Sequence, residues 1–279
     1  MQNNITIKTH KNGLKYLDIK TPQCKAKIFL HGAQITSFIP NDRPDLLWVS
    51  EENTYQPGTS IRGGIPICWP WFGPHQDSKK PQHGYARNQL WELNSISYDA
   101  DTLCITMYLP NTKKLLNQDL NLEIIFKLST ELQIELINRN NSDETIQVTQ
   151  ALHSYFPVSD IKKVKINGLK GAEYFEFGKG PTSDHEDFVQ INNETDRSYQ
   201  KVNEQQTILD ESREIIISRI NSKSVVLWNP WIEKSKSLSN FSSIDYKKMI
   251  CLEAANILDD KIILEPNQTH KLILTIKEN

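Results

Sequence analysis

The sequence predicts an all-β protein in which two antiparallel sheets pack face to face. Two observations predict this class. Short segments in which apolar and polar residues alternate recur along the chain, as is typical of strands that are buried on one side only. Segments with helical periodicity are scarce. Because so many one-sided strands need a partner surface for their apolar faces, we expect a sandwich of two packed sheets.

The expected strands follow one another from the first residues to the last. Asn12-Gly13 is a signal for a tight hairpin turn, and it separates the first two alternating runs. Three polar, irregular segments, 41–60, 74–82 and 181–210, are expected to be long loops, where binding residues usually lie. The alternating runs lie at residues 5–10, 14–20, 25–30, 103–109, 122–129, 132–139, 145–152, 214–220, 224–229, 249–256, 261–266 and 270–278.

Length and charge narrow the class of protein. The pattern continues through 279 residues without a linker or low-complexity insert, so we expect one domain, residues 1–279. The 32 basic and 34 acidic side chains give a net charge of −2, which argues against a nucleic-acid partner. A signal-peptide core and an apolar run long enough for a membrane span are both absent, so we expect a soluble, cytoplasmic protein. The sequence does not define the oligomeric state, and a monomer is the expectation.

Motifs for metals and cofactors are absent from the sequence. The four cysteines are far apart and form no CxxC pair, so neither a zinc cluster nor a disulfide framework is expected. There is no glycine-rich phosphate loop, HExxH, GxSxG or dinucleotide fingerprint. We therefore expect no cofactor and no metal, and we look for chemistry that side chains can perform by themselves.

The most unusual stretch is SIRGGIPICWPWFG, at residues 60–73. Gly63-Gly64 permits backbone angles that other residues avoid, or the close approach of a ligand. The two tryptophans and the phenylalanine present flat apolar faces, on which the C–H faces of a sugar ring can stack. Arg62 offers a planar fork that suits phosphate or carboxylate. The alternative is a structural loop that is packed by its own aromatic side chains.

The stretch QHGYAR, at residues 82–87, adds Gln82, His83 and Arg87. Arg87 can share an anion with Arg62 if the fold brings the two side chains together. The alternative is that both arginines lie in solvent on the surface, which is the commoner place for this residue type.

Two further stretches place an ionisable side chain in apolar company. In ALHSYF, His153 follows an alternating run and is a candidate acid or base; the alternative is a core histidine bonded to a backbone carbonyl. In MICLEAAN, Glu253 interrupts an apolar strand, on the strand face that also carries Cys251. A carboxylate in that place is paired or functional. The alternative to a function is an ion pair with Lys247 or Lys248.

A polar segment and a pair of tryptophans complete the set. NETDRSY, at residues 193–199, places Asp196 in an expected loop, where it can bind hydroxyl groups. Its alternatives are a turn residue or an ion pair with Arg197. The stretch LWNPW supplies Trp228 and Trp231.

Six stretches follow one another in the order SIRGGIPICWPWFG, HGYAR, ALHSYF, ETDRSY, LWNPW and CLEAAN. Together they resemble the glucose-6-phosphate 1-epimerases, also called hexose-6-phosphate mutarotases, of the aldose 1-epimerase superfamily. The resemblance covers residues 25 to 275. It implies a galactose-mutarotase-like antiparallel β-supersandwich that interconverts the α and β anomers of a small phosphosugar. Departures from the family pattern are Ala254 for proline, Ser154 for threonine, and LEPNQ at 264–268 for a Pro-Gly-Glu turn. None of them removes a functional group.

The resemblance also implies roles for individual residues. The expected catalytic residues are His153 and Glu253, and the residues expected to contact the substrate are Arg62, Gln82, Arg87 and Asp196. The chemistry of ring opening, and not the resemblance, adds His83 to the expected substrate-binding residues. We expect His153 to protonate the ring oxygen and Glu253 to take the proton of the C1 hydroxyl, from opposite sides of C1. His83 is expected to hydrogen-bond the opened sugar or the ring oxygen.

Two other functions stay open at this point. An aldose 1-epimerase that acts on unphosphorylated sugars would use the same catalytic pair. A non-catalytic carbohydrate-binding module of the same sandwich type would need the aromatic side chains and Asp196, but neither His153 nor Glu253.

Overall fold

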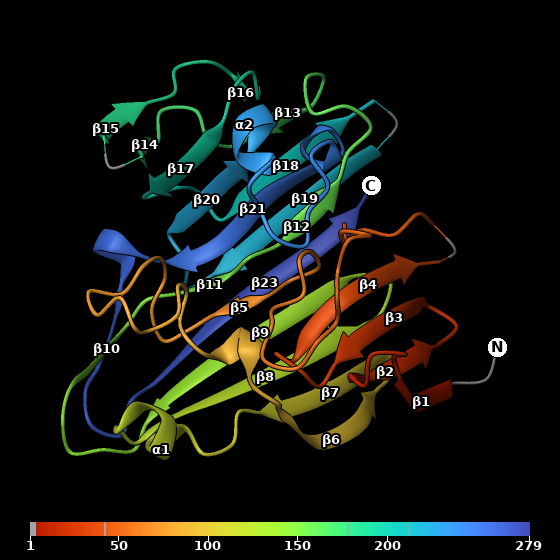
Figure 1. Ribbon diagram of the computed structural model, residues 1–279, viewed down its shortest axis with the longest axis vertical. Helices are drawn as coiled ribbons and strands as arrows, with labels where there is room; N and C mark the ends of the chain where they lie inside the picture. The colour runs from red at the N-terminus through yellow and green to blue at the C-terminus, as the bar shows by residue number, and fades with distance from the viewer. Residues whose placement is uncertain (1–3, 42, 178, 212) are drawn as a thin grey trace.

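The protein is described by a computed structural model that covers residues 4–41, 43–177, 179–211 and 213–279. These residues form 23 strands, two five-residue α-helices and three short 3-10 helices. The named strands pair antiparallel with their neighbours throughout. The predicted all-β, antiparallel class is therefore confirmed (Figure 1).

The largest sheet has nine strands and includes the most regular alternation in the sequence. In β8, residues Leu120–Leu128, every second residue is buried, as expected for a strand that faces a core on one side. The order across this sheet is β16 (Phe188–Val189), β13 (Lys165–Asn167), β18 (Gln205–Asp210), β19 (Arg213–Ile220), β23 (Thr269–Glu278), β9 (Leu132–Asn140), β8, β7 (Thr102–Tyr108) and β6 (Glu92–Asp99).

The second sheet has eight strands, and its two central strands are buried on both faces. Every residue of β20 (Ser224–Asn229) and of β21 (Met249–Asn256) is buried. The order is β15 (Lys179–Ser183), β14 (Glu173–Glu176), β17 (Thr195–Gln200), β20, β21, β11 (Gln150–Leu152) and β5 (Ile67–Cys68), and β12 (Tyr155–Pro157) also pairs with β21. One face of β21 contributes to the core. Its other face is covered by loops, which are described below with the cavity beside this strand.

Two smaller sheets and five short helices complete the chain. The smaller sheets are β1 (Asn4–Thr9), β2 (Lys15–Lys20), β3 (Cys24–Phe29) and β4 (Gln34–Pro40), and the pair β10 (Ile146–Val148) and β22 (Ile262–Leu264). The helices are α1 (Thr112–Leu116), α2 (Trp231–Ser235), and 3-10 turns at Ala86–Asn88, Asp245–Lys247 and Leu258–Asp260. Within the part of the chain that the structure describes, no helix is long and apolar enough to cross a membrane.

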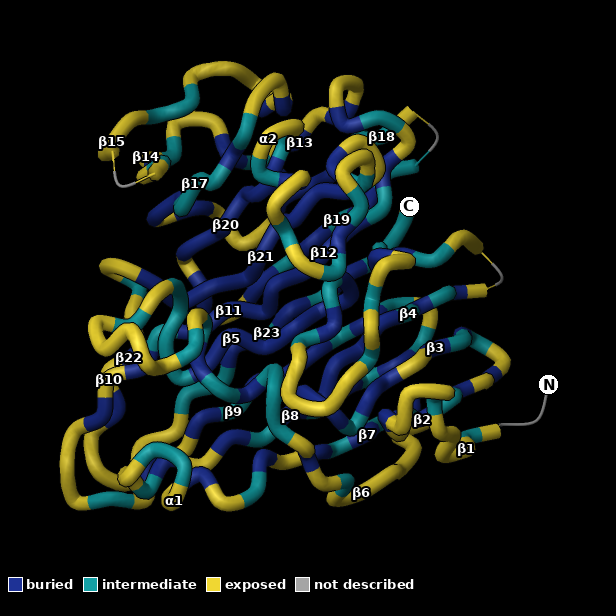
Figure 2. Tube along the Cα trace, in the orientation of Figure 1, coloured by how far each residue is buried: buried dark blue, intermediate teal, exposed yellow. Residues whose placement is uncertain are grey.

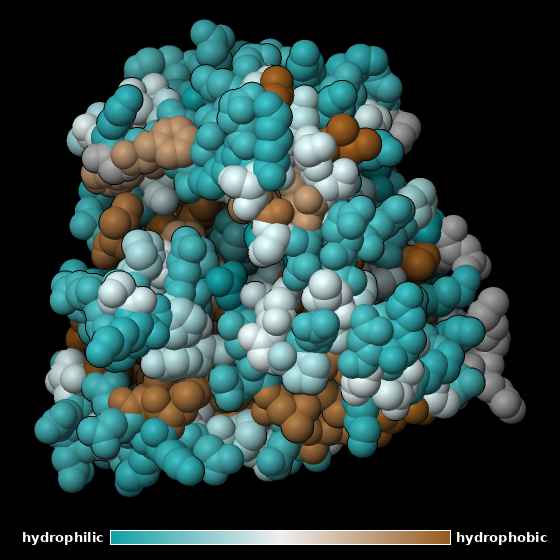
Figure 3. Space-filling view, in the orientation of Figure 1, coloured by the Kyte–Doolittle hydropathy of each residue, from teal (hydrophilic) through white to brown (hydrophobic). Residues whose placement is uncertain are grey.

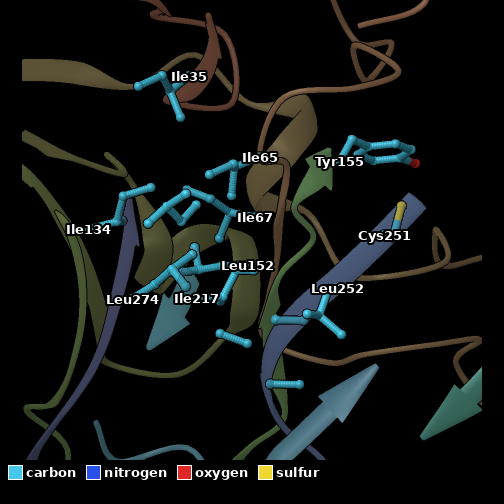
Figure 4. Close-up of a cluster of buried hydrophobic side chains, with 14 of the residues drawn as sticks. Ile35, Ile65, Ile67, Ile134, Leu152, Tyr155, Ile217, Cys251, Leu252 and Leu274 are labelled. Atoms are coloured by element: carbon cyan, nitrogen blue, oxygen red, sulfur yellow. The ribbon is translucent and has the colours of Figure 1, made fainter. Parts of the chain in front are cut away.

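A large cluster of buried apolar side chains joins the three larger sheets. Figure 4 shows part of it, with Ile35 of β4, Ile67 of β5, Ile134 of β9, Leu152 of β11 and Ile217 of β19 in one group. Each such side chain contributes about 1.5–3 kcal/mol when it is fully buried. In Figure 2 the strands β20 and β21 are buried throughout, whereas the edge strands β1, β6 and β15 are largely exposed.

A chain of buried amides also links the two largest sheets. The Trp69 indole N–H donates to Asn138 of β9 (2.7 Å), whose amide donates to Gln150 of β11 (2.8 Å). Gln150 in turn donates to Asn256 of β21 (3.0 Å). Because the buried amides bond one another, their hydrogen bonds offset the cost of desolvation while the network fixes how the sheets pack against each other. Trp69 is therefore a core residue, and the expectation that it presents a face to a sugar is wrong.

Most expected strands are confirmed, and two expectations need correction. The Asn12-Gly13 turn joins β1 and β2, with Gly13 in the left-handed region at φ +93°. The run 145–152 is two strands in different sheets, because the chain changes sheet at Thr149. Segment 181–210, expected as a loop, contains the end of β15 and all of β16, β17 and β18. Its strands are short and polar, so alternation did not reveal them.

Two of the three expected loops are confirmed within the described residues. Segments 41–60 and 74–82 contain no named strand or helix, and residue 42 lies outside the described part.

The double glycine of the 60–73 stretch is required by the backbone around it. Gly63 and Gly64 both have positive φ, at +116° and +61°. A Cβ on Gly64 would lie 2.2 Å from the carbonyl oxygen of Ile35. The backbone of Gly64 accepts a hydrogen bond from the Tyr155 N–H (2.9 Å) and donates one to Trp48 (2.7 Å). Of the two explanations considered for these glycines, backbone angles that other residues avoid are observed, and the close approach is one of backbone to backbone.

We predict that Gly64→Ala destabilises the fold far more than Gly58→Ala. Both positions have positive φ, so both substitutions carry the left-handed penalty of about 1–2 kcal/mol. A Cβ on Gly58 meets nothing within 4 Å, whereas one on Gly64 collides with backbone. Urea unfolding should give a loss of about 3 kcal/mol or more for Gly64→Ala. Equal losses for the two variants would contradict the close packing described here.

Candidate active site

A cavity of about 460 Å³ opens beside the covered face of β21. Its walls come from the 60–73 stretch, the 82–87 stretch, the end of β11 with β12, strands β17, β20 and β21, and the segment after α2. All seven predicted site residues line it: Arg62, Gln82, His83, Arg87, His153, Asp196 and Glu253. The fold therefore brings together five stretches that are far apart in the sequence. Figure 3 shows that this face of the molecule is mainly hydrophilic, with apolar side chains in separate patches.

His153 and Glu253 meet because their strands are neighbours. Strand β21 pairs with β11 and then with β12, and His153 lies at the break between those two strands. The register sets Leu152 opposite Ala254 and Tyr155 opposite Cys251. Nε2 of His153 consequently lies 3.3 Å from Oε1 of Glu253. The two side chains are 11% and 1% exposed, so water screens the contact little.

The structural alternatives for this pair are not observed. Nδ1 of His153 is buried, and no described hydrogen bond joins it to the backbone carbonyl of another residue. Oε2 of Glu253 is buried without a partner as well. Among the described residues, neither Lys247 nor Lys248 forms an ion pair with Glu253. Buried polar atoms without partners are costly, and they are common where a ligand completes the bonding.

The environment favours the uncharged form of each of the two groups. Burial raises the pKa of the Glu253 carboxyl well above its ordinary value, and the nearby Asp196 charge raises this pKa further. Burial lowers the pKa of His153 well below its ordinary value, and His83, Arg87 and Arg62 add to the lowering. Both shifts favour the uncharged forms, so a proton that the pair shares is favoured on the carboxyl over the imidazole.

His83 is a neutral hydrogen-bond donor at the cavity wall. The backbone N–H of Gly73 donates to its Nδ1 (3.1 Å), so the ring proton of the neutral form sits on Nε2. Burial, then the charges of Arg87 and Arg62, lowers the pKa of His83 to about 3. Its Nε2–H can therefore donate to a bound oxygen at neutral pH without changing charge.

The two arginines line the same cavity, as the sequence analysis required for a shared anion. Arg62 donates to the Tyr155 hydroxyl (3.4 Å) and the Ser239 carbonyl (3.3 Å). Arg87 donates to the Gln82 carbonyl (2.9 Å), and its Nε is buried without a partner. Within the described part of the chain neither guanidinium forms an ion pair with a carboxylate. Two unpaired guanidinium groups at one cavity suit a dianion such as a phosphate ester.

Asp196 lies on a strand, so its predicted place in a loop is wrong. It belongs to β17, beside Trp228 of β20, and lines the cavity. Its carboxyl oxygen is 3.8 Å from Nζ of Lys234, and burial raises its pKa. Arg197 forms ion pairs with Glu176 and Asp184 instead, so the alternative of an Asp196–Arg197 pair is not observed.

Lys234 is a cavity residue that the sequence analysis missed. It comes from α2, three residues after the end of the LWNPW stretch, and it also contacts Glu194 (3.3 Å). Nothing in its local sequence distinguishes it from the many surface lysines.

Three aromatic side chains line the cavity, and two of them, Phe72 and Trp228, are among those that the sequence analysis singled out. Phe72, Tyr155 and Trp228 face it. Trp71 packs edge-on against Tyr85 outside it, and Trp231 packs against Tyr246. The Tyr155 ring stacks on His153, with centroids 4.8 Å apart and planes 9° from parallel. Figure 4 shows Tyr155 and Cys251 near each other, apart from the core isoleucines.

A sequence model of a known family covers nearly all of this chain. The model, described as aldose 1-epimerase, matches residues 15–277. The chain belongs to the aldose 1-epimerase family. A protein named "putative glucose-6-phosphate 1-epimerase" from Escherichia coli (strain K12) is 33% identical over 263 residues, which cover 92% of this chain and 88% of that protein. A protein of the same name from Cenchrus ciliaris is 30% identical over 264 residues, which cover 88% and 78%.

Solved structures in this family have the same fold. The crystal structure of a protein named "putative mutarotase" from Salmonella typhimurium has a TM-score of 0.89 and 30% identity, covering 98% of this chain and 93% of that one. A galactose 1-epimerase from Lactobacillus acidophilus NCFM has a TM-score of 0.74 at 15% identity, covering 100% and 99%. The expected galactose-mutarotase-like sandwich is therefore confirmed.

One feature of the geometry differs from the expectation, and it still suits an epimerase of this family. The acid and the base were expected on opposite sides of C1, but His153 and Glu253 are in direct contact. Ring opening at an anomeric carbon moves one proton onto the ring oxygen and one off the C1 hydroxyl, and both oxygens are bonded to the same carbon. A contact pair that shares one proton can serve both oxygens. Among the described residues no cluster of His, Cys, Asp and Glu is arranged to hold a metal ion.

We predict that Glu253→Gln stabilises the fold, and increasingly so as the pH rises. The folded-state pKa of Glu253 lies above its unfolded value, so its stabilising effect is complete below the unfolded pKa and is lost as pH rises toward the folded pKa. Glutamine does not titrate and avoids that loss. The melting temperature should match the parent protein at about pH 4 and exceed it by about 3 °C or more at about pH 8.

The matched control is Glu233→Gln, which replaces an exposed carboxylate on α2. It should follow the parent protein at both pH values. A Glu253→Gln difference that does not grow between the two pH values would mean that the carboxyl is ordinary in the folded state.

Proposed function

We propose that this protein interconverts the α and β anomers of hexose 6-phosphates, with glucose 6-phosphate as the main substrate. The observation that carries the proposal is the buried His153–Glu253 contact in a cavity that also holds two arginines without carboxylate partners. The pair supplies acid–base chemistry at a sugar carbon, and the arginines supply a place for a phosphate. The name carried by the Escherichia coli and Cenchrus ciliaris relatives supports this substrate class.

Ring opening uses the ionic form of the pair. The Glu253 carboxylate takes the proton of the C1 hydroxyl while the His153 Nε2–H delivers its proton to the ring oxygen. The bond between C1 and the ring oxygen breaks, and C1 becomes an aldehyde. The pair is left in its neutral form, with the proton on the carboxyl. General acid–base catalysis of this kind contributes about 10²–10⁴-fold to a rate.

Ring closure reverses these steps on the other face of the aldehyde. After rotation about the C1–C2 bond, His153 takes the proton of the attacking hydroxyl and Glu253 returns its proton to the carbonyl oxygen. The pair returns to its ionic form, so the cycle consumes no proton. The 3.3 Å contact also lets a proton pass directly between the two groups, so each form remains accessible.

The other cavity residues bind and orient the sugar in this proposal. Arg62 and Arg87 hold the phosphate, and charge-assisted hydrogen bonds of this kind are worth about 1.5–3 kcal/mol each. Gln82 and Asp196 bind hydroxyl groups, and the Nε2–H of His83 donates to the ring oxygen or to the opened sugar. The rings of Phe72, Tyr155 and Trp228 exclude water from the reacting carbon.

The two other functions fit the cavity less well. An epimerase for unphosphorylated sugars has no use for two arginines without carboxylate partners. A carbohydrate-binding module has no use for a desolvated histidine and carboxyl in contact, because both are costly to bury.

We also propose that residues 1–279 form one domain that acts as a monomer in the cytoplasm. A core cluster with members from β2 to β23 supports one domain. A cavity that one chain lines by itself supports a monomer. A phosphorylated sugar crosses lipid poorly because of its charge, so the enzyme is expected in the compartment where the sugar is phosphorylated.

Anomer exchange measured by NMR tests the function directly. We predict that catalytic protein accelerates exchange of glucose 6-phosphate strongly and exchange of glucose weakly. Glu253→Gln should bind glucose 6-phosphate as the parent does and exchange it about 10²–10⁴-fold more slowly. The control Glu233→Gln, outside the cavity, should retain full activity.

Other outcomes favour the competing functions. Equal acceleration of both sugars identifies an epimerase for free sugars, and binding without acceleration identifies a module. A fully active Glu253→Gln protein removes Glu253 as the base.

A further inference from the structure

The positive charges of the phosphate-binding side chains face the catalytic imidazole. Arg62 hydrogen-bonds the Tyr155 hydroxyl (3.4 Å), and the Tyr155 ring stacks directly on His153. Arg87 follows His83 by four residues, and the His83 ring stands edge-on to His153 with centroids 6.1 Å apart. Arg62 therefore reaches His153 through one intervening ring. Arg87 lines the same cavity, and its charge acts on both His83 and His153.

We propose that the substrate's phosphate is an electrostatic activator of His153 as well as an anchor. By neutralising Arg62 and Arg87, the dianion allows the imidazole to hold the proton that the ring oxygen must receive. This inference rests on the proposed function, and it adds a catalytic consequence to the phosphate site.

Among the groups around His153, the two arginines carry the positive charges that a bound anion can neutralise. On β21, Glu253 contacts Nε2 and shares the proton. On β12 and β20, Tyr155 and Trp228 present uncharged rings. His83 is neutral near pH 7 because its pKa is about 3. Arg62 and Arg87 remain, and each carries a full positive charge without a carboxylate partner in the described residues.

The effect of these charges on His153 has a definite sign. Arg87 and Arg62 both lower the pKa of His153, in addition to the larger effects of burial and of His83, and Arg87 also lowers the pKa of Glu253. A bound dianion opposes that contribution, since charges interact strongly where water is excluded. For a mostly neutral imidazole, each unit by which the pKa rises gives tenfold more of the protonated form. The phosphate should thus raise the rate of the bound sugar's reaction, whereas a pure anchor improves binding alone.

An experiment with the substrate supplied as two separate pieces distinguishes activation of His153 by the phosphate from anchoring of the sugar by the phosphate. Unphosphorylated α-glucose is the sugar piece, and phosphite, at a pH where it is a dianion, is the phosphate piece. We predict that phosphite accelerates enzymatic anomer exchange of glucose by about tenfold or more, with saturation. Chloride at matched ionic strength should not, and the exchange that phosphite causes without protein is subtracted. Imidazole NMR of the full-length protein should show that phosphite raises the pKa of His153.

Arg87→Ala gives a second test, because loss of this side chain is expected to raise one activity of the protein and lower another. Removal of this charge should raise exchange of unphosphorylated glucose in the absence of phosphite, while it slows exchange of glucose 6-phosphate and weakens activation by phosphite. The control is Lys236→Ala, which removes an exposed cation outside the cavity and should behave as the parent does. Circular dichroism establishes that both variants are folded. Loss of glucose exchange in a folded Arg87→Ala protein would contradict activation through charge.

The outcomes separate this inference from the function on which it rests. If phosphite competes with glucose 6-phosphate but changes neither glucose exchange nor the His153 titration, the phosphate is only an anchor and the inference is wrong. If phosphite does not compete and glucose 6-phosphate has no advantage over glucose, the hexose 6-phosphate function itself is wrong.

Discussion

The contact between the His153 imidazole and the Glu253 carboxyl is the interaction on which the rest of the site depends. Each group loses hydration when it is buried, and each therefore favours its uncharged form. Because the two groups are in contact, one proton can move from the carboxyl to the imidazole. This move converts two uncharged groups into an ion pair without changing the net charge. The same exchange is what ring opening and closing of a sugar require.

The sandwich makes this contact possible by burying both faces of β21. Leu252 packs into the core on one face, and Glu253 reaches the cavity on the other. The amide chain from Trp69 to Asn256 fixes β21 and β11 against the nine-stranded sheet. Gly64 lets the 60–73 stretch approach β4 and bind the backbone of Tyr155. A rigid strand pair, with loops fastened over it, keeps the two ionisable groups within reach of one carbon.

Much of this was predictable from the sequence, and the remainder depended on tertiary contacts. Strands such as β8 alternate regularly, so periodicity placed them, but β17 is short and polar, and Asp196 was therefore assigned to a loop. Motif resemblance supplied the seven cavity residues, although their roles stay predictions, as does the single domain. It could not show that Trp69 turns inward to an amide partner, or that Lys234 turns toward the cavity. Those directions are set by packing between segments that are distant in the chain.

The most direct test of the central claim is a pH titration of the substrate-free protein, followed by NMR of the His153 imidazole nitrogens and the Glu253 carboxyl carbon. The shared-proton account predicts that both signals respond to the same transitions, and that the pair holds one proton throughout the neutral range. Independent titration of the imidazole near pH 6.5 and of the carboxyl near pH 4.3, the approximate values for isolated groups, would contradict it.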